Sequence, residues 1–333
     1  MSKDPLSTSD NQNGLCGGIH TATLCTNDLQ AIKDFYVKGM GMQLEGPYQL
    51  SSNTIQTQHD LWGLESPVKY EYYHLHRASV PGLIQLRVLF MQSETPMIHK
   101  SYSSREIGSF SLGFPNGDQK SLDTKLRSQG VEAMAPLQID EIARPDGTTY
   151  PYLETIFKGP DYLHCVGIER GGGMSQLAPI DTTTNLGGPG YSAFVTDRSD
   201  QELAFYTEVL GMELRADRYW EAAEDGALGI PAGVSFRFSL VYAPGTAKNH
   251  MLFLDYQDGI FEQPAAPSRI PNRGLAMWTI ETSDMELVLQ NASKQNIDII
   301  ARNIGLEDPI IGRAKCSTLL TPTGFLIEVF EKL

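Results

Sequence analysis

The amino-acid sequence predicts an α+β protein in which four βαβββ units form two tandem paired domains with curved mixed sheets. Four observations lead to this fold class. The chain has 333 residues, which suits two domains of about 150 residues better than one core. The two halves of the chain repeat each other, and each helical pattern stands among several strand-like runs. A content of 41% hydrophobic and 20% charged residues is typical of a globular protein.

The repeat is visible when DFYVKGMGMQLEG, which starts at Asp34, is compared with AFYTEVLGMELRA, which starts at Ala204. Five residues of the first segment recur at one constant spacing in the second: Phe35, Tyr36, Gly41, Met42 and Leu44 become Phe205, Tyr206, Gly211, Met212 and Leu214. Such self-similarity indicates a duplication. We therefore expect one domain over residues 15–168 and another over residues 189–333. Residues 169–188 are rich in Gly, Thr and Pro and predict a linker, and the polar residues 1–14 predict a disordered tail.

Helical periodicity predicts one helix in each unit, over residues 28–40, 118–130, 200–210 and 284–295. Asn27 and Asp28 provide an N-cap for the first of them. A strand-like run precedes this helix in HTATLC, and further runs follow it in KYEYYHLHRA and GLIQLRVLF. One helix for several strands favours an α+β fold over a parallel sheet with a crossover helix between all strands.

Charge and composition exclude several kinds of partner. The formal net charge is -14 and the pI is near 4.9, so we expect binding neither to nucleic acid nor to a membrane. No apolar run approaches the roughly 20 residues that a membrane helix needs, and the N-terminal residues lack the apolar segment of a secretion signal. The four cysteines form no C-x-x-C pair, and we expect them to be reduced and buried in a cytoplasmic protein. Monomer and homodimer both remain open.

The order of these motifs resembles the vicinal oxygen chelate superfamily, which includes glyoxalases, bleomycin resistance proteins and extradiol dioxygenases. A strand, an aspartate, a helix with FY and a following glycine–methionine pair resemble its opening unit. SLDTKLRSQGVE resembles the helix of its second unit, and TPTGFLIEVFE resembles its closing strand. The resemblance covers the chain from about Gly14 to Leu333. It implies that paired units form a cup-shaped sheet and that the cup holds the site.

In that superfamily the first and last strands of the units supply metal ligands, and the resemblance transfers these positions to this chain. They fall on His20, Gln85, Gly108 or a neighbour, Val166, Gly190, Leu252 or a neighbour, Ala276 and Glu328. A mononuclear catalytic site needs about three protein ligands, and the two-histidine, one-carboxylate set of non-haem iron is absent here. His20, Gln85 and Glu328 are therefore the candidate ligands of one divalent ion, such as iron, manganese or zinc. Catalysis without a metal remains equally open.

The N-terminal domain is the predicted site, because its candidate positions are polar. His20 is a candidate base or ligand, since an imidazole titrates near neutrality, and the alternative is a hydrogen-bonded histidine at a strand start. Gln85 stands in an apolar strand, where an inward polar group needs a partner. His164 shares a strand face with Val166 and is a candidate second imidazole, or else a histidine near the rim. If Glu328 is not a metal ligand, it is either a residue left from an ancestral metal site or the partner of an ion pair.

One strand of the first copy has an unusual polar face. Alternation in KYEYYHLHRA places four such side chains on it: Tyr70, Tyr72, His74 and His76. The second copy has apolar or aromatic residues instead: Phe236, Phe238, Leu240 and Tyr242. Because a core strand gains nothing from imidazoles, the first face predicts the lining of a ligand pocket, with a half-exposed sheet edge as the alternative. Trp62 is a candidate for its wall, against a default role in core packing. The C-terminal domain is expected to be degenerate.

Three functions remain open for the N-terminal domain. The first is a glyoxalase-like lyase or isomerase that transfers a proton next to a carbonyl group in a small hydrophobic or aromatic substrate. His20 would be its base, His164 or His74 its acid, and Gln85 and Tyr72 would hold the substrate oxygen. Tyr70, His76 and Trp62 would line the pocket. The second function is non-catalytic binding of an apolar small molecule, as in a resistance protein. The third is ring cleavage by a dioxygenase, which predicts bound iron.

Overall fold

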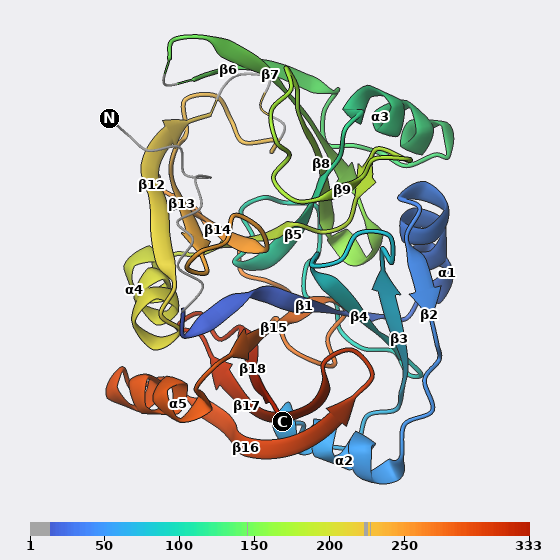
Figure 1. Cartoon of the computed structure of the whole chain (residues 1–333), viewed down its shortest axis with the longest axis vertical. Helices are drawn as coiled ribbons and strands as arrows, with labels where there is room; N and C mark the ends of the chain where they lie inside the picture. The colour runs from blue at the N-terminus through green and yellow to red at the C-terminus, as the bar shows by residue number, and fades with distance from the viewer. Residues whose placement is uncertain (1–13, 145, 223–225, 227) are drawn as a thin grey trace.

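The computed structural model describes residues 14–144, 146–222, 226 and 228–333 and contains two eight-stranded sheets, one above the other in Figure 1. The first sheet has the order β16-β17-β18-β15-β1-β4-β3-β2, and the second has the order β12-β13-β14-β11-β5-β8-β7-β6. Both sheets curve. Four βαβββ units supply all sixteen of these strands, so the predicted α+β class and unit composition are confirmed. The predicted tail lies outside the described residues, apart from its last residue, Gly14.

The strands of the first sheet come from the two ends of the chain. They are β1 (Cys16–Thr26), β2 (Gln43–Glu45), β3 (Tyr70–His76), β4 (Gln85–Met91), β15 (Gly274–Thr282), β16 (Ile299–Asp308), β17 (Gly312–Leu320) and β18 (Leu326–Lys332). The strands of the second sheet come from the middle. They are β5 (Gly108–Pro115), β6 (Gln138–Ala143), β7 (Thr149–Lys158), β8 (His164–Arg170), β11 (Tyr191–Val195), β12 (Glu213–Glu221), β13 (Ser235–Tyr242) and β14 (His250–Tyr256).

The pairing of the units differs from our expectation. We expected each half of the chain to close its own cup, but the first unit pairs with the fourth through antiparallel β1 and β15. The second unit pairs with the third through antiparallel β5 and β11. In every unit the first strand also runs parallel to the last, as β1 does to β4. The first strand of each unit has an unpaired edge, which can form backbone hydrogen bonds with the first strand of any other unit. The sequence of one unit does not determine which unit that is.

Each helix begins at the capping residue that the sequence offers or close to it. Asp28 accepts a hydrogen bond from the Ala31 amide at 2.8 Å and caps α1 (Leu29–Ile32), which continues as the π-helical segment η1 (Lys33–Gly39). The chain then reverses at Gly41, whose φ is 70°, a value that L side chains rarely adopt. Gly211 has φ 67° at the matching place, which explains why the repeat keeps a glycine there.

The other predicted helices are present. They are α3 (Gln119–Ser128), α4 (Ser199–Ala204) with η3 (Phe205–Val209), and α5 (Met285–Lys294). Together with α1 they lie along the seam between the two sheets (Figure 1). The main core fills this seam and includes the repeated aromatic pairs, with Tyr36 and Tyr206 fully buried. The repeated residues of the sequence are therefore residues with equivalent positions in the core.

One helix was not predicted. Helix α2 (Ser52–Leu61) is mainly polar. Its sequence therefore lacks the apolar periodicity from which the other helices were predicted. It begins at Ser51, whose hydroxyl accepts a hydrogen bond from the Thr54 amide. It lies inside the first sheet and packs against β16. Leu61 and Trp62 at its end are buried among the side chains of that sheet.

The predicted linker is folded in part. It begins at the end of β8 and contains a short hairpin of β9 (Ile180–Asp181) and β10 (Leu186–Gly187). The buried Arg77 guanidinium donates to the Gly187 carbonyl oxygen at 3.0 Å and so attaches this hairpin to the first unit. All four cysteines are free and buried, as predicted. Among the described residues, no helix is long and apolar enough to cross a membrane.

Candidate functional site

The curved sheets enclose two hollows, which we call the first cup, inside the first sheet, and the second cup, inside the second sheet. A buried ion pair occupies the interior of the first cup. The Arg87 guanidinium donates two hydrogen bonds, both 3.0 Å long, to Oε1 of Glu328, and both side chains are fully buried. Trp62 donates to Oε2 of the same carboxylate at 2.9 Å, and Thr279 donates to Oε1 at 2.9 Å. Glu328 is therefore an ion-pair partner, one of the two alternatives to a ligand.

A second carboxylate extends this network. Asp308 lies 3.5 Å from Arg87 and accepts a hydrogen bond from the Tyr72 hydroxyl at 2.9 Å. Gln58 of α2 donates to Asp308 at 3.2 Å and accepts from Tyr70 at 2.6 Å. Burial disfavours the Arg87 charge, but its acidic neighbours outweigh this effect and hold its pKa well above the usual value. Tyr70 and Tyr72 on the polar face of β3 thus turn inward, where Tyr70 pairs with Gln58 of α2 and Tyr72 pairs with Asp308.

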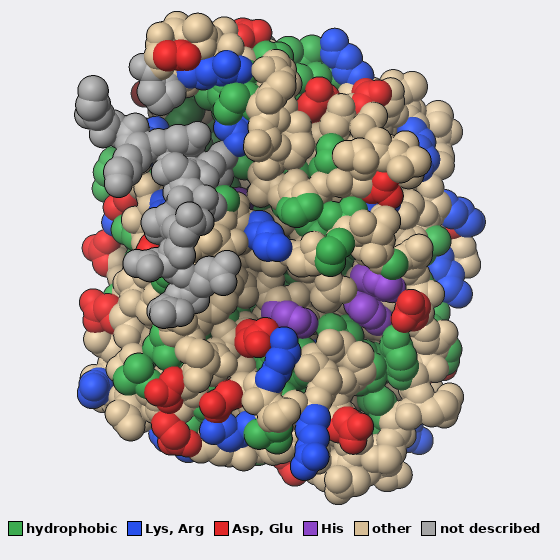
Figure 2. Space-filling view, viewed as in Figure 1, with side chains coloured by type: hydrophobic (Ala, Val, Ile, Leu, Met, Phe, Trp, Pro, Cys, Tyr) green, Lys and Arg blue, Asp and Glu red, His purple; other side chains and the backbone are tan. Residues whose placement is uncertain are grey.

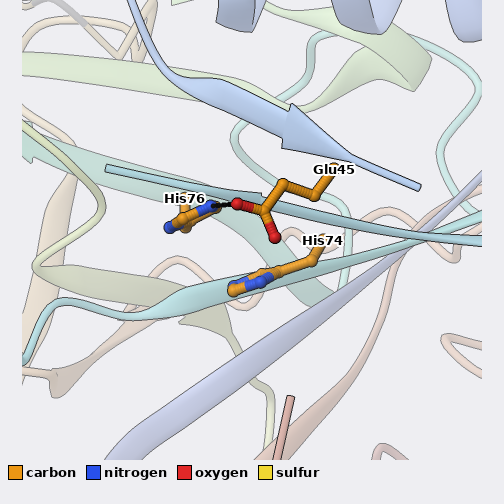
Figure 3. A group of neighbouring side chains, drawn as sticks. All are labelled: Glu45, His74 and His76. Atoms are coloured by element: carbon orange, nitrogen blue, oxygen red, sulfur yellow. Dashed lines mark hydrogen bonds and ion pairs between the residues drawn. The ribbon is translucent and has the colours of Figure 1, made fainter. Parts of the chain in front are cut away.

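The outer part of the same face reaches the rim of the first cup. His74 and His76 stack with ring centroids 4.2 Å apart, and Nε2 of His76 lies 3.0 Å from Oε1 of Glu45 (Figure 3). Nε2 of His74 lies 2.8 Å from the amide oxygen of Gln85. Burial lowers the pKa of His74, although the Gln85 contact opposes this shift. Histidine side chains are visible on this face of the molecule (Figure 2).

His20 packs on Phe330, with ring centroids 5.1 Å apart, and its Nδ1 lies 2.8 Å from the Thr21 hydroxyl. Burial lowers the pKa of His20 to about 4, although Glu281 opposes the shift, so the imidazole is neutral. The structure does not bring His164 to it. His164 belongs to the second sheet, where it lies between the rings of Tyr102 and Phe110. Burial lowers its pKa to about 4. The expected His20–His164 pair is therefore not formed.

The three predicted metal ligands do not fit a common ion. Both oxygens of Glu328 already accept hydrogen bonds, and the Arg87 guanidinium stands where a cation would be held. Gln85 is paired with His74, and His20 forms no close ligand group with other His, Cys, Asp or Glu side chains of the described residues. In the second cup the transferred positions include Val166 and Leu252, which have no donor atoms. These positions therefore do not form a metal site.

The second cup contains a large cavity of about 1030 Å³. Its wall is mostly apolar and aromatic, and all eight strands of the second sheet contribute to it. The β13 residues that correspond to the polar face of β3 line it: Phe236, Phe238, Leu240 and Tyr242. We expected the second copy to be degenerate, but this face lines a cavity. Among the described residues, no helix fills the second cup as α2 fills the first. A concave apolar cavity of this size is typical of a small-molecule site.

A carboxyl group lies on the cavity wall. Alternation along β7 places Tyr150, Tyr152, Glu154 and Ile156 on the cavity side. Burial raises the pKa of the Glu154 carboxyl to about 7, and the Tyr152 hydroxyl, which donates to it at 3.2 Å, opposes this shift. Glu154 is therefore divided between its acid and its base form near neutral pH. Such a group suits proton transfer.

A neutral imidazole lines the same cavity. His250 is 3% exposed and lies between two tyrosine rings, with centroids 5.1 Å from Tyr191 and 4.4 Å from Tyr242. Burial lowers the pKa of His250 to about 3, so its ring carries no charge at neutral pH. Its Nδ1 has no hydrogen-bond partner in the described part of the chain. An unpartnered buried nitrogen in a cavity wall is available to a ligand.

Three arginines lie along the cavity wall. Arg144 and Arg170 stack on the Tyr150 ring, with guanidinium carbons 5.6 Å and 5.1 Å from its centroid. Arg170 is 6% exposed and donates to the Ser175 carbonyl oxygen and the Tyr150 hydroxyl. Arg218 is exposed and belongs to β12. None of the three forms an ion pair within the described residues, which leaves positive charge available to an anionic ligand group.

Glu154 and His250 were not predicted as site residues, for different reasons. Glu154 shares the Tyr150–Tyr152 face of β7, and the alternation argument used for β3 would have found it. His250 begins β14 and lies opposite Tyr191 in the parallel β11–β14 pair, just as Gln85 lies opposite Thr21. The equivalence of His250 and Gln85 is visible only from the strand register, because insertions change the spacing between equivalent residues in the sequence.

Comparison with known proteins agrees with this architecture. Residues 188–329 match the family model described as "Glyoxalase/Bleomycin resistance protein/Dioxygenase superfamily". No curated protein matches the chain significantly. Among solved structures, glyoxalase I from Zea mays is similar, with a TM-score of 0.57 and 14% identity over 94% of this chain and 92% of that chain. A putative dioxygenase from Bacillus subtilis has a TM-score of 0.53 and 15% identity over 96% and 86%.

At these identities the structural likeness concerns the fold, and it extends over both sheets. The family match covers the third unit and most of the fourth, and the repeat relates the first unit to the third. Residues 188–329 thus match the Glyoxalase/Bleomycin resistance protein/Dioxygenase superfamily, and the chain shares its fold with glyoxalase I from Zea mays.

Proposed function

We propose that this protein binds a small apolar or aromatic compound with an anionic or carbonyl oxygen in the second cup, and that Glu154 transfers a proton next to its carbonyl group. The observation that carries this proposal is the position of Glu154 on the wall of a 1030 Å³ cavity, where burial raises the pKa of its carboxyl to about 7. The second cup is preferred over the first because α2 fills the first and pairs with its polar groups.

The proposed step needs no redox partner. The Glu154 carboxylate takes a proton from the carbon next to the carbonyl group, and the C–H electron pair becomes the double bond of an enolate. The protonated Glu154 then returns a proton to the same carbon while the carbonyl double bond forms again, which gives hydrogen exchange or inversion at that carbon. A general base with a pKa near the working pH contributes about 10²- to 10⁴-fold to the rate of such a step.

The other polar groups of the cavity support the same ligand class. Arg144, Arg170 and Arg218 favour a carboxylate or another anion, and guanidinium groups hold such oxygens through paired hydrogen bonds. The free Nδ1 of His250 offers a hydrogen bond to the carbonyl or enolate oxygen. The aromatic walls favour a flat or apolar body. These features describe an aryl or alkyl oxo acid better than a neutral hydrocarbon.

A second candidate function is binding without catalysis. The specific observation that favours it is the predominance of aromatic and aliphatic side chains in the cavity wall, which is sufficient to hold an apolar compound. In that case Glu154 would act only as a polar contact.

Two measurements test the proposal. Binding is measured with the fluorophore 1-anilinonaphthalene-8-sulfonate, which combines an apolar body with an anion. We expect one saturable site in the wild type, loss of binding in Val166→Trp, whose indole fills the cavity, and unchanged binding in Leu214→Trp, whose indole is added at an exposed position outside it. Equal binding by Val166→Trp would contradict the location of the site.

Catalysis is measured as deuterium incorporation next to the carbonyl group of phenylpyruvate, followed by proton NMR in heavy water. The wild type should accelerate exchange over buffer, and Glu154→Gln should lose about 100-fold or more of this acceleration while still binding the fluorophore. Fluorophore binding with no accelerated exchange in the wild type would favour the binding protein. Acceleration that survives in Glu154→Gln would reject Glu154 as the base.

A further inference from the structure

We propose that Glu45, His74 and His76, which we call the rim triad, bind one divalent transition-metal ion at the edge of the first cup (Figure 3). One ligand atom from each side chain lies within 4.8 Å of the other two. Among the described residues, this is the one group of three or more His, Cys, Asp or Glu side chains that meets this distance. The triad lies on β2 and β3, so it differs from the first-strand and last-strand positions that resemblance suggested.

The fold builds this group from two adjacent strands. His74 and His76 are two residues apart on β3, so their rings point to the same side of the sheet. Glu45 lies directly opposite His74 in the antiparallel β2–β3 pair. A carboxylate and an imidazole are therefore cross-strand neighbours, and the second imidazole stacks on the first with an angle of 13° between the rings.

The spacing allows a metal to bind after small side-chain movements. Imidazole nitrogens and carboxylate oxygens bind zinc at about 2.0–2.2 Å, so ligand atoms of one ion lie about 3–4 Å apart. The observed separations, up to 4.8 Å, can close through rotation of χ angles without a change in the strands. The Glu45 side chain is 54% exposed, which leaves it free to rotate and gives an ion access from solvent.

The donor set determines the kind of ion. Two imidazoles and one carboxylate suit Zn²⁺, Ni²⁺ or Fe²⁺, whereas Mg²⁺ and Ca²⁺ prefer oxygen ligands. The Gln85 amide oxygen, 2.8 Å from Nε2 of His74, adds a neighbouring acceptor that orients this ring. An ion pair would account for Glu45 and His76, but it would not account for the second imidazole stacked against the first. A metal uses all three groups.

The test is isothermal titration of the metal-free full chain with ZnCl₂. We expect one ion per chain, and we expect the double variant His74→Ala/His76→Ala to lose at least about 100-fold in affinity, since losing two of three ligands removes most of the site. Glu45→Gln should weaken binding about 10-fold. Glu281→Gln is the matched control, because it removes a carboxylate near His20 while the rim triad stays intact. MgCl₂ should give no heat of binding.

The melting temperature with and without zinc distinguishes a variant that has lost the metal site from a variant that does not fold. Zinc should raise the melting temperature of the wild type and of Glu281→Gln but not that of the double variant, which should unfold cooperatively without zinc. The visible spectrum of bound Co²⁺ reports nitrogen ligands directly and should be absent in the double variant. Zinc affinity that is equal in the wild type and the double variant, or dependent on Glu281, would overturn the proposal. These results concern the first cup and do not depend on Glu154 in the second.

Discussion

Arg87 and Glu328 occupy corresponding positions in the two halves of the first sheet. Arg87 lies opposite Thr23 in the parallel β1–β4 pair, and Glu328 lies opposite Thr279 in the parallel β15–β18 pair. The two halves therefore meet through opposite charges from equivalent places. Because the pair is fully buried and extends to Asp308, it connects the first and last units of the chain at the centre of their shared cup.

The first prediction concerns this pair. Arg87→Met leaves the carboxylates of Glu328 and Asp308 buried without their cation, so we expect it to lower the free energy of unfolding by about 3–5 kcal/mol. The double variant Arg87→Met/Glu328→Met should cost less than the sum of the two single changes, since it leaves fewer uncompensated charges. Urea unfolding of the four proteins measures the coupling. Additive single costs would show that the two charges do not depend on each other.

The second prediction is a pH dependence caused by Glu154. The pKa of its carboxyl rises from 4.5 to about 7 on folding, so the folded state holds this proton more tightly than the unfolded state. Stability should therefore fall as the pH rises from about 4.5 to 7, because the unfolded chain releases the proton first. The Glu154→Gln variant lacks this loss and should gain on the order of 3 kcal/mol relative to the wild type across the window.

Urea unfolding of both proteins at several pH values between 4.5 and 8 provides the measurement. The difference in unfolding free energy between the two proteins is the quantity to follow, since it cancels the other titrating groups. A difference that stays constant with pH would mean that Glu154 has an ordinary pKa and is unsuited to the proposed base.

The third prediction separates charge from apolar contact in the second cup. Arg218 is exposed on β12 and lines the cavity. Arg218→Ala should weaken binding of anionic 1-anilinonaphthalene-8-sulfonate about 10-fold, the effect of one lost charge-assisted hydrogen bond. It should change the binding of the neutral N-phenyl-1-naphthylamine by less than about 2-fold. Fluorescence titration measures both, and an equal loss for the two probes would point to disturbed packing instead of lost charge.

The four units could be predicted from the sequence because their cores repeat. The first and third units share an aromatic pair in the helix and a positive-φ glycine where the helix turns to the next strand, at Gly41 and Gly211. The pairing of the units could not be predicted in this way. It depends on which first strands meet, and β1 of the first unit meets β15 of the fourth across most of the chain length.

The location of the candidate site could also not be predicted from local sequence patterns. The polar face of β3 was expected to line a pocket, and its inner residues do face the first cup, but Tyr72 pairs with Asp308 and Arg87 there. Whether a cup is open depends on α2, a polar helix with little periodicity that fills one cup and has no counterpart among the described residues of the other. The alternation of residues along a strand predicts which side chains face a cup. Whether another element fills that cup depends on the tertiary structure.

The last prediction uses this difference between the cups. Trp62→Phe keeps the aromatic packing of α2 but removes the indole hydrogen bond to Glu328, so a buried carboxylate oxygen loses a donor. We expect a loss of about 1–3 kcal/mol in unfolding free energy. Binding of 1-anilinonaphthalene-8-sulfonate in the second cup should remain within about 2-fold of the wild type, because the cavity shares no residue with this network. A large loss of fluorophore binding in this variant would mean that the first cup, and not the second, holds the ligand.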